Sequence, residues 1–178
     1  MDLNAYGSLR MILGVLPQMR KQKNGQIINV SSIGVLTGPP RFGAYVASKA
    51  YIDAFSRCVS GECSPDNVVF STCYIPLTRT KMVVSKENKY DHVKLYTPEQ
   101  SAGLIERAIV TKERKVLTPL AWWTSIGYFL WPSAVEGVLN LMYKLEPEAA
   151  PSGQVESLTA KGDKEQLKKL GTLFSGAL

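Results

Sequence analysis

The stretch SSIGVLTGPPRFGAYVASKA, residues 31–50, contains three side chains whose spacing makes chemical sense only when they are taken together. They are Ser32, Tyr45 and Lys49. Tyr45 and Lys49 are four residues apart, so on a helix they lie on one face within reach of each other. Ser32 ends the run IINVSS, whose apolar residues predict a buried strand, and twelve residues separate it from Tyr45, enough for a loop that folds back. The sequence therefore predicts that the three side chains converge.

This combination suits reversible proton transfer to a carbonyl or alcohol oxygen. A free tyrosine, with a pKa of about 10, is a poor acid or base at neutral pH, but a nearby lysine cation favours the phenolate. A serine hydroxyl at a strand end can hydrogen-bond the oxygen that gains or loses the proton. Taken singly, a Tyr-Lys pair on a helix is usually an exposed surface pair, and two serines after a strand usually belong to a turn. The order strand, loop and small-residue helix favours the catalytic interpretation.

Helical and strand patterns alternate along the chain, which predicts an α/β fold with a parallel sheet. The expected elements are a helix over residues 3–22, a strand at 26–31, a helix over 43–62, a strand at 68–75, a helix after Thr97 and a short strand at 115–118. We expect Pro17 to kink the first helix and Gly25 to close it. Thr97 and Gln100 form a capping box, with proline at the first helical position.

Two later segments lack this clear alternation. Residues 76–96 are polar and poorly periodic, which predicts a lid or substrate loop. Residues 116–135 contain no charge and reach the length of a membrane span. Because Pro119 and Pro132 interrupt this run, we favour an apolar helix beside a substrate pocket over a span, with peripheral membrane contact as the alternative. Ser133 and Glu136 form a second candidate capping box, which predicts that a helix starts there.

Composition indicates one soluble domain. The chain has 178 residues, 45% hydrophobic and 20% charged, and the polar residues 147–178 are expected to form a linker and tail after a domain at 1–146. The net charge of +6 is spread over the ends of elements, which excludes a nucleic-acid surface and leaves cofactor or coenzyme A phosphates as partners.

Three cysteines and one histidine lack the spacing of a metal site or a disulfide framework. The start of the chain has no signal-peptide pattern. We therefore expect a reduced, cytoplasmic location, with membrane association as a further option.

The pattern IINVSS-x12-YVASK resembles the C-terminal half of the short-chain dehydrogenases/reductases, whose fold is a doubly wound parallel-sheet Rossmann domain. In that family a serine precedes the tyrosine by thirteen positions, the lysine follows the tyrosine by four, and an asparagine lies about twenty-eight positions before the serine. Ser32, Tyr45, Lys49 and Asn4 match these intervals. The resemblance implies that Tyr45 is the general acid or base and that Ser32 orients the substrate carbonyl. It also implies that Lys49 favours the phenolate and binds the nicotinamide ribose, and that Asn4 holds a water in a proton relay.

The run IPLTRTKM, together with SIGV and PPRF, is similar to the reductase domains of bacterial fatty acyl-CoA reductases. That resemblance implies reduction of long-chain acyl-CoA to aldehyde with NADPH, and a generic ketone or alcohol reductase using NADP or NAD is the competing interpretation. The family usually has a Pro-Gly that contacts the nicotinamide and a threonine shortly after it. Pro76 and Thr80 are the matching residues here, with Leu77 in place of the glycine.

One feature of the family has no counterpart in the sequence. The family holds the cofactor pyrophosphate in a glycine-rich turn, T-G-x-x-x-G-x-G, after its first strand. The only similar run is TGPPRFG, residues 37–43, whose glycine spacing and position are wrong. We therefore expect a catalytic half without its nucleotide-binding half, explained most simply by a truncated or mis-started reading frame. Alone, this half would have an unpaired strand edge, poor solubility and no cofactor affinity.

A non-catalytic remnant is the alternative to a reductase. It would act as an interaction module through the helices at 3–22 and 43–62. In the family these helices commonly pack against a partner subunit, so the resemblance implies a homo-oligomer under either interpretation.

Overall fold

The computed structural model describes residues 1–84 and 95–145. The chain divides into two compact units, Met1–Asn140 and Leu141–Leu178. The first unit contains the sheet and all of the candidate site residues. The linker and tail predicted for residues 147–178 lie outside the described residues.

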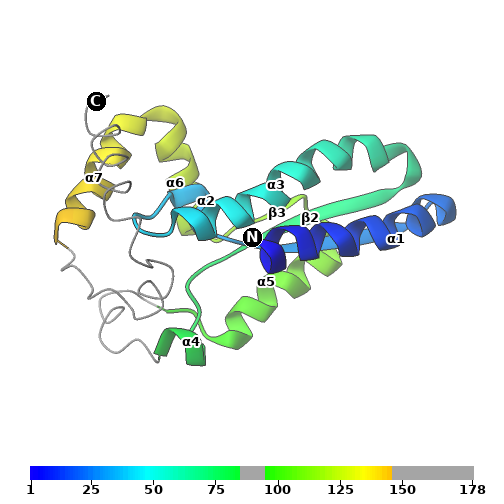
Figure 1. The fold of residues 1–178 in the computed structure, drawn as a ribbon, viewed down its shortest axis with the longest axis horizontal. Helices are drawn as coiled ribbons and strands as arrows, with labels where there is room; N and C mark the ends of the chain where they lie inside the picture. Colours follow the sequence, from blue (N-terminus) through cyan, green and yellow to red (C-terminus); the bar gives the residue numbers. More distant parts are fainter. Residues whose placement is uncertain (85–94, 146–178) are drawn as a thin grey trace, which may run out of the picture. The chain divides into compact units, whose positions relative to one another are not determined.

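A parallel three-stranded sheet forms the centre of the first unit (Figure 1). Its strands are β1 (Gly25–Ser32), β2 (Val68–Ile75) and β3 (Lys115–Val116), in the spatial order β1-β2-β3. β1 and β2 pair over their whole length, from Gly25 opposite Val68 to Ser32 opposite Ile75. Since all three strands are parallel, their carboxyl ends meet at one edge of the sheet, which confirms the predicted fold class.

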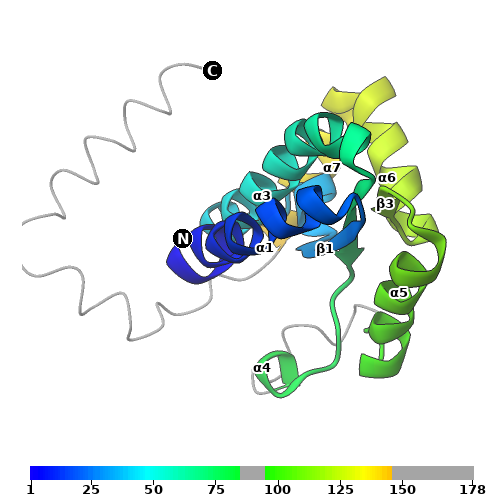
Figure 2. The ribbon, with the colours of Figure 1, turned by 90° about the vertical axis from the view of Figure 1, so that its right-hand side faces the viewer.

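Helices cover both faces of the sheet, as Figure 2 shows. On one face lie α1 (Ser8–Gln22) and α3 (Gly43–Cys63), and on the other lies α5 (Pro98–Thr111). The first core contains buried residues of both helices and both long strands: Ile12, Leu16, Ile27, Ile52, Cys63, Val68 and Phe70. The second core contains Cys73, Ala108 and Val116. Alternate side chains of β2 enter opposite cores, which is how a strand buried on both faces is stabilised.

The N-terminal helical segment ends at residue 22 as predicted, but it differs from the prediction at its start and in the residue that closes it. Residues Asp2–Gly7 form a π-helix, η1, and α1 follows it with Pro17 in its interior. The helix ends at Gln22, with Lys23 in the left-handed conformation (φ 52°), so the prediction that Gly25 closes it was wrong. Gly25 instead begins β1. A Cβ atom there would lie 2.7 Å from the Met19 side chain, so the absence of a side chain lets α1 pack closely against the strand.

Buried polar pairs connect α3 to the sheet. Asn29 Nδ2 donates a hydrogen bond of 2.6 Å to Ser56 Oγ, and Tyr74 Oη donates one of 2.6 Å to Asp53 Oδ1. Asp53 also lies 3.4 Å from the Arg57 guanidinium. Burial, followed by the hydrogen bond to Asp53, raises the pKa of Tyr74 far above its ordinary value. These directional contacts fix α3 in one position on the strands.

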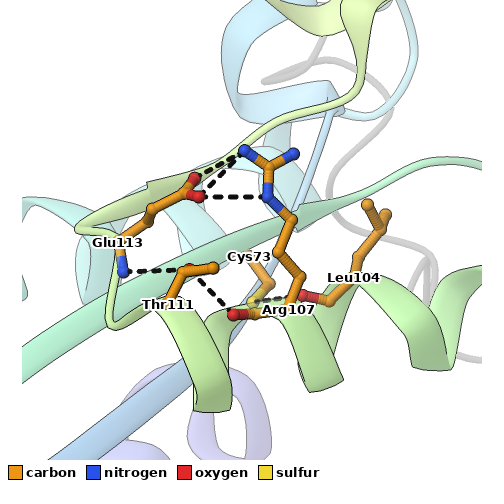
Figure 3. Close-up of polar contacts among 5 residues, drawn as sticks. All are labelled: Cys73, Leu104, Arg107, Thr111 and Glu113. Atoms are coloured by element: carbon orange, nitrogen blue, oxygen red, sulfur yellow. Dashed lines mark hydrogen bonds and ion pairs between the residues drawn. The ribbon is translucent and has the colours of Figure 1, made fainter.

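The helix α5 begins at the predicted capping box and leads into β3. Thr97 Oγ1 accepts a hydrogen bond from the Gln100 amide, and the Gln100 side chain accepts one from the Thr97 amide. At the other end, Arg107 forms a bidentate ion pair with Glu113 that bridges the turn into β3 (Figure 3). Cys73 Sγ lies 3.8 Å from the carbonyl of Leu104, which places α5 directly against β2 (Figure 3).

The predicted loop and the apolar segment both contain short helices. The loop includes α4 (Lys81–Val84) and a bridge between Thr78 and Tyr96, and its residues 85–94 lie outside the described part. The apolar segment forms α6 (Pro119–Leu130) and α7 (Pro132–Leu145), interrupted at Trp131. Within residues 1–84 and 95–145, no helix is long and apolar enough to cross a membrane.

Two helix starts in the apolar segment differ from the prediction. Thr118 caps α6 by accepting a hydrogen bond from the Ala121 amide, a cap that the predicted strand over 115–118 concealed. The capping box predicted at Ser133 was wrong, because α7 already begins at Pro132.

Candidate active site

Ser32 lies at the carboxyl edge of the sheet, as the last residue of β1. Its Oγ accepts a hydrogen bond of 3.2 Å from the amide of Gly34, the first residue of α2 (Gly34–Thr37). A Cβ atom on Gly34 would lie 3.5 Å from Ser32 Oγ and 3.4 Å from the Val46 side chain. These are ordinary contact distances, so the turn after Ser32 packs against Val46 of α3, and Ser32 lies close to the segment that contains Tyr45.

Tyr45 and Lys49 occupy successive turns at the N-terminal end of α3. Tyr45 is 42% exposed, so its side chain is open to a ligand at this edge. Lys49 Nζ donates a hydrogen bond of 3.0 Å to the backbone carbonyl of Val30, two residues before Ser32. Burial lowers the pKa of Lys49, because a partly desolvated ammonium is less stable than one in water. The hydrogen bond to Val30 connects α3 to the end of β1.

Asn4 reaches the same helix from the π-helix η1. Its Nδ2 donates a hydrogen bond of 3.3 Å to Ser48 Oγ, and that hydroxyl in turn donates one of 2.6 Å to the carbonyl of Tyr45. Ser48 is buried between the two predicted catalytic positions. A π-helical turn is uncommon and is frequently found at functional sites. Residues 2–7 therefore position Asn4 beside Tyr45 and Lys49.

Ser48 is a site residue that the sequence reasoning missed. In the sequence, the only indication of its role is its position within YVASK, directly before Lys49. In the part of the chain that the structure describes, the hydroxyls of Ser32 and Tyr45 share no direct hydrogen bond. Catalytic hydrogen bonds often form only when substrate is bound, so this geometry is compatible with the predicted constellation.

Pro76 follows the end of β2 at the same edge of the sheet. The amide of Ile33, next to Ser32, donates a hydrogen bond of 3.0 Å to the carbonyl of Ile75, which places Pro76 close to the serine turn. Thr80 lies further along the chain, is exposed and precedes α4, where its carbonyl accepts a bond from the amide of Val83. The structure gives no contact that joins Thr80 to the other predicted site residues among those it describes.

The residues at this edge fit one end of a nicotinamide cofactor. The exposed Tyr45 side chain and the Lys49 ammonium are hydrogen-bonding groups that suit ribose hydroxyls, and Pro76 lies where the backbone leaves the sheet. Among the described residues no cluster of histidine, cysteine or carboxylate side chains could hold a metal ion.

A cavity of about 250 Å³ lies elsewhere, along the C-terminal half of α3. Its lining residues are Asp53, Ser56, Arg57, Ser60, Phe70, Thr72, Arg114 and Lys115. None of the predicted site residues lines it. The site at the carboxyl edge is therefore separate from this cavity.

Comparison with known proteins identifies the family. The family model described as short chain dehydrogenase matches residues 1–91. A fatty acyl-CoA reductase of Acinetobacter baylyi is 41% identical over 98% of this chain and 56% of its own length. An uncharacterised oxidoreductase of Mycobacterium tuberculosis is 37% identical over 98% of this chain and 50% of its own length. The chain belongs to the short-chain dehydrogenase family, and within that family it is similar to fatty acyl-CoA reductases.

Solved structures agree with the fold. A short-chain dehydrogenase of Burkholderia cenocepacia in complex with NADP superimposes with a TM-score of 0.66 at 21% identity, covering 83% of this chain and 58% of the other. A short-chain dehydrogenase of Sphingobium yanoikuyae in complex with NADPH gives 0.58 at 20% identity, covering 84% and 57%. The chain thus spans about half the length of the curated relatives cited above.

Proposed function

We propose that this chain provides the proton-transfer half of an NAD(P)-dependent reductase that acts on a carbonyl group. The observation that supports this most strongly is the pair of contacts around the start of α3. Lys49 binds the carbonyl of Val30 near the end of β1, and Asn4 binds Ser48 beside Lys49. These two contacts support a site in which the asparagine, the tyrosine and the lysine act at one strand end.

In this proposal the reacting oxygen lies between Ser32 and Tyr45. The Ser32 hydroxyl donates a hydrogen bond to the substrate carbonyl oxygen and Tyr45 Oη transfers its proton to that oxygen. The Lys49 ammonium favours the phenolate that Tyr45 leaves behind, and Asn4 holds the water through which the proton is replaced. A bound nicotinamide cofactor would supply the hydride that reduces the carbonyl carbon.

The nicotinamide and its ribose would contact Tyr45, Lys49 and Pro76, with Thr80 as a further candidate. The pyrophosphate needs a glycine-rich turn before a helix N-terminus. The run at residues 37–43 does not match one, because its glycine spacing differs and it lies between Ser32 and Tyr45. We therefore propose that the 178 residues alone do not bind the cofactor tightly and that another segment, from the same or another chain, completes the site.

We further propose a long-chain fatty acyl-CoA as the substrate. Addition of a hydride to its carbonyl carbon and a proton to its oxygen would give a hemithioacetal, whose C–S bond then breaks to release the aldehyde and the free thiol of coenzyme A. Two observations support this choice over a generic ketone or alcohol. A relative at 41% identity is named fatty acyl-CoA reductase. In addition, the apolar helix α6 packs against α2, directly after Ser32, where it can accompany an acyl chain.

The test is a Tyr45→Phe variant in a protein that includes the reading frame preceding Met1. Removal of the phenolic proton donor should lower turnover of acyl-CoA by about 10²-fold or more, as loss of a general acid does. NADPH affinity should change little, because Lys49 and Pro76 remain. Tyr51→Phe, on the exposed side of the same helix, is the matched control. Turnover retained by Tyr45→Phe would refute the assignment.

Pairing of two copies through the N-terminal helices is the second candidate function. Apolar side chains of η1, α1 and α3 are exposed, among them Leu3, Met11, Leu13, Val15 and Tyr51. Such exposed apolar side chains would be buried in a dimer, with or without catalysis. Sedimentation equilibrium should show a dimer that Met11→Glu dissociates, whereas a wild-type monomer would remove this candidate.

A further inference from the structure

The helix α6 has an exposed apolar surface that takes no part in the proposed proton transfer. Trp123 is 66% exposed, Trp131 is 67% exposed and Phe129 is 86% exposed. Trp123 and Leu130 fall on one side of the helix at 100° per residue, opposite the fully buried Ala121. We call Leu120, Trp122, Trp123, Phe129, Leu130 and Trp131 the α6 surface. So many large apolar side chains exposed together indicate a binding surface.

The charge pattern around the α6 surface favours a lipid bilayer as its occupant. Residues 116–135 contain no charged side chain, and Arg114 and Lys115 precede them directly. The whole chain has a net charge of +6. An uncharged, tryptophan-rich helix next to basic residues matches the layered chemistry of an anionic membrane surface, where indole rings occupy the headgroup region.

The dimensions of α6 define how such contact would be made. The helix has 12 residues, which is about 18 Å at 1.5 Å per residue, whereas a bilayer core is about 30 Å thick. The helix is therefore too short to span and can only lie in the interfacial plane. No side chain of the α6 surface lines the cavity along α3, so the surface and the cavity are separate.

We propose that the α6 surface docks onto the surface of an anionic lipid bilayer, with α6 parallel to the membrane plane. Because α6 packs against α2, the bilayer would then lie next to the turn that follows Ser32. If the proposed acyl-CoA substrate is correct, its chain can pass from the membrane to the site along this helix. That last step rests on the proposed function, whereas the docking itself does not.

Intrinsic fluorescence tests the docking directly. The three tryptophans of the chain, Trp122, Trp123 and Trp131, all belong to the α6 surface, so their emission reports on this surface alone. Vesicles of phosphatidylcholine with phosphatidylglycerol should shift the emission to shorter wavelength, and brominated lipids should quench it. Pure phosphatidylcholine vesicles should bind more weakly, and added salt should weaken binding to the anionic vesicles.

A pair of matched variants keeps the test specific. Leu130→Glu places a charge on the α6 surface, and Ile109→Glu places one on α5 at an equal exposure of 53%. Leu130→Glu should weaken vesicle binding by about tenfold or more, while Ile109→Glu should bind nearly as the wild type does. Circular dichroism of both variants verifies that they are folded.

Several outcomes would overturn the proposal. These are an unshifted emission of the wild type with anionic vesicles, equal weakening by both variants, or a dimer that Leu130→Glu dissociates without any vesicle binding. The assay needs no cofactor and no turnover. Loss of the docking proposal would therefore leave the reductase proposal standing, and the reverse also holds.

Discussion

Among single side chains, Tyr74 has the most direct influence on the site without belonging to it. It is fully buried in β2, and its hydroxyl donates to Asp53 on α3, the helix that also contains Tyr45 and Lys49. An acceptor buried without its donor costs more free energy than one hydrogen bond contributes. Tyr74 therefore positions the catalytic helix from the strand beneath it.

Replacing Tyr74 with phenylalanine tests this role. The variant keeps the ring and leaves a buried Asp53 oxygen without its donor, so the free energy of unfolding should fall by about 1 to 3 kcal/mol. Urea denaturation followed by circular dichroism measures this loss. Tyr51→Phe removes a hydroxyl from the partly exposed side of α3 and should stay within about 0.5 kcal/mol of the wild type. Equal losses in the two variants would contradict the role assigned to Tyr74.

Asp66 makes the stability of the chain depend on pH. Hydrogen bonds from Lys23 and Arg20, at the end of α1, hold the pKa of its carboxyl below the ordinary value of 3.8. A carboxyl with a lowered folded-state pKa stabilises the fold above its unfolded pKa, and this contribution disappears as the pH falls through the folded value. The ionised Asp66 therefore stabilises the junction of α1 and η2 (Ser64–Asp66) at neutral pH.

The variant Asp66→Asn should be less stable than the wild type at neutral pH. As the pH falls below 3.8, the difference between the two should shrink, since the wild-type carboxyl becomes protonated. Urea midpoints measured across this range provide the comparison, with Glu106→Gln as an exposed control on α5. A difference that stays constant with pH would show that the charge of Asp66 is not what stabilises this junction.

At the scale of elements, the start of α5 depends on its capping box. Thr97 and Gln100 satisfy each other's backbone amides, and these are groups that a helix start otherwise leaves to water. Thr97→Ala should lower the free energy of unfolding by about 1 kcal/mol, and Thr97→Ser should restore most of it. Chemical denaturation of the two variants tests this. Equal stability of Thr97→Ala and the wild type would mean that packing alone holds the helix start.

The sequence predicted well the helices and strands whose bounds depend on residues that are neighbours along the chain. The predicted strand at 68–75 coincides with β2, and the predicted helix at 43–62 differs from α3 by one residue. The helix start at Ser133 failed for an equally local reason. Proline is favoured at the first helical position, and the Trp131 carbonyl accepts the amides of Ala134 and Val135, so the helix begins two residues earlier than a cap at Ser133 implies.

Contacts within the site were less accessible from sequence. The spacing of Ser32, Tyr45 and Lys49 is visible in the chain, but the bonds from Lys49 to Val30 and from Asn4 to Ser48 join residues 19 and 44 positions apart. Such contacts depend on how α3 and η1 pack on β1. Sequence spacing predicts which residues can meet, whereas packing determines which atoms do.

For the whole molecule, the edge position of β1 has the largest consequence, because it affects solubility. Among the described residues it is an edge strand, paired only with β2, which agrees with the predicted unpaired edge. The exposed side chain of Val30 shows that one face of the strand also lacks full apolar cover there. An uncovered edge strand can pair with other chains. Poor solubility of the chain alone therefore stays a prediction, which expression trials can measure.

NADPH affinity tests the prediction that the 178 residues do not form a complete cofactor site. Titration of NADPH into the 178-residue chain should give no saturable change in nucleotide fluorescence, because a pyrophosphate site is not expected within it. A protein extended by the reading frame that precedes Met1 should bind NADPH if that frame encodes a glycine-rich strand, turn and helix. Tight binding to the 178 residues alone would contradict the prediction.

The three cysteines provide a way to follow the two layers of the fold separately. Cys58 is exposed, while Cys63 belongs to the core under α1 and α3, and Cys73 to the core over α5. Burial raises the pKa of both inner thiols, so a thiol reagent should label Cys58 first. Labelling of Cys63 and Cys73 then requires local opening of the layer that covers each one. Their two rates in a single experiment would rank the helical layers by stability.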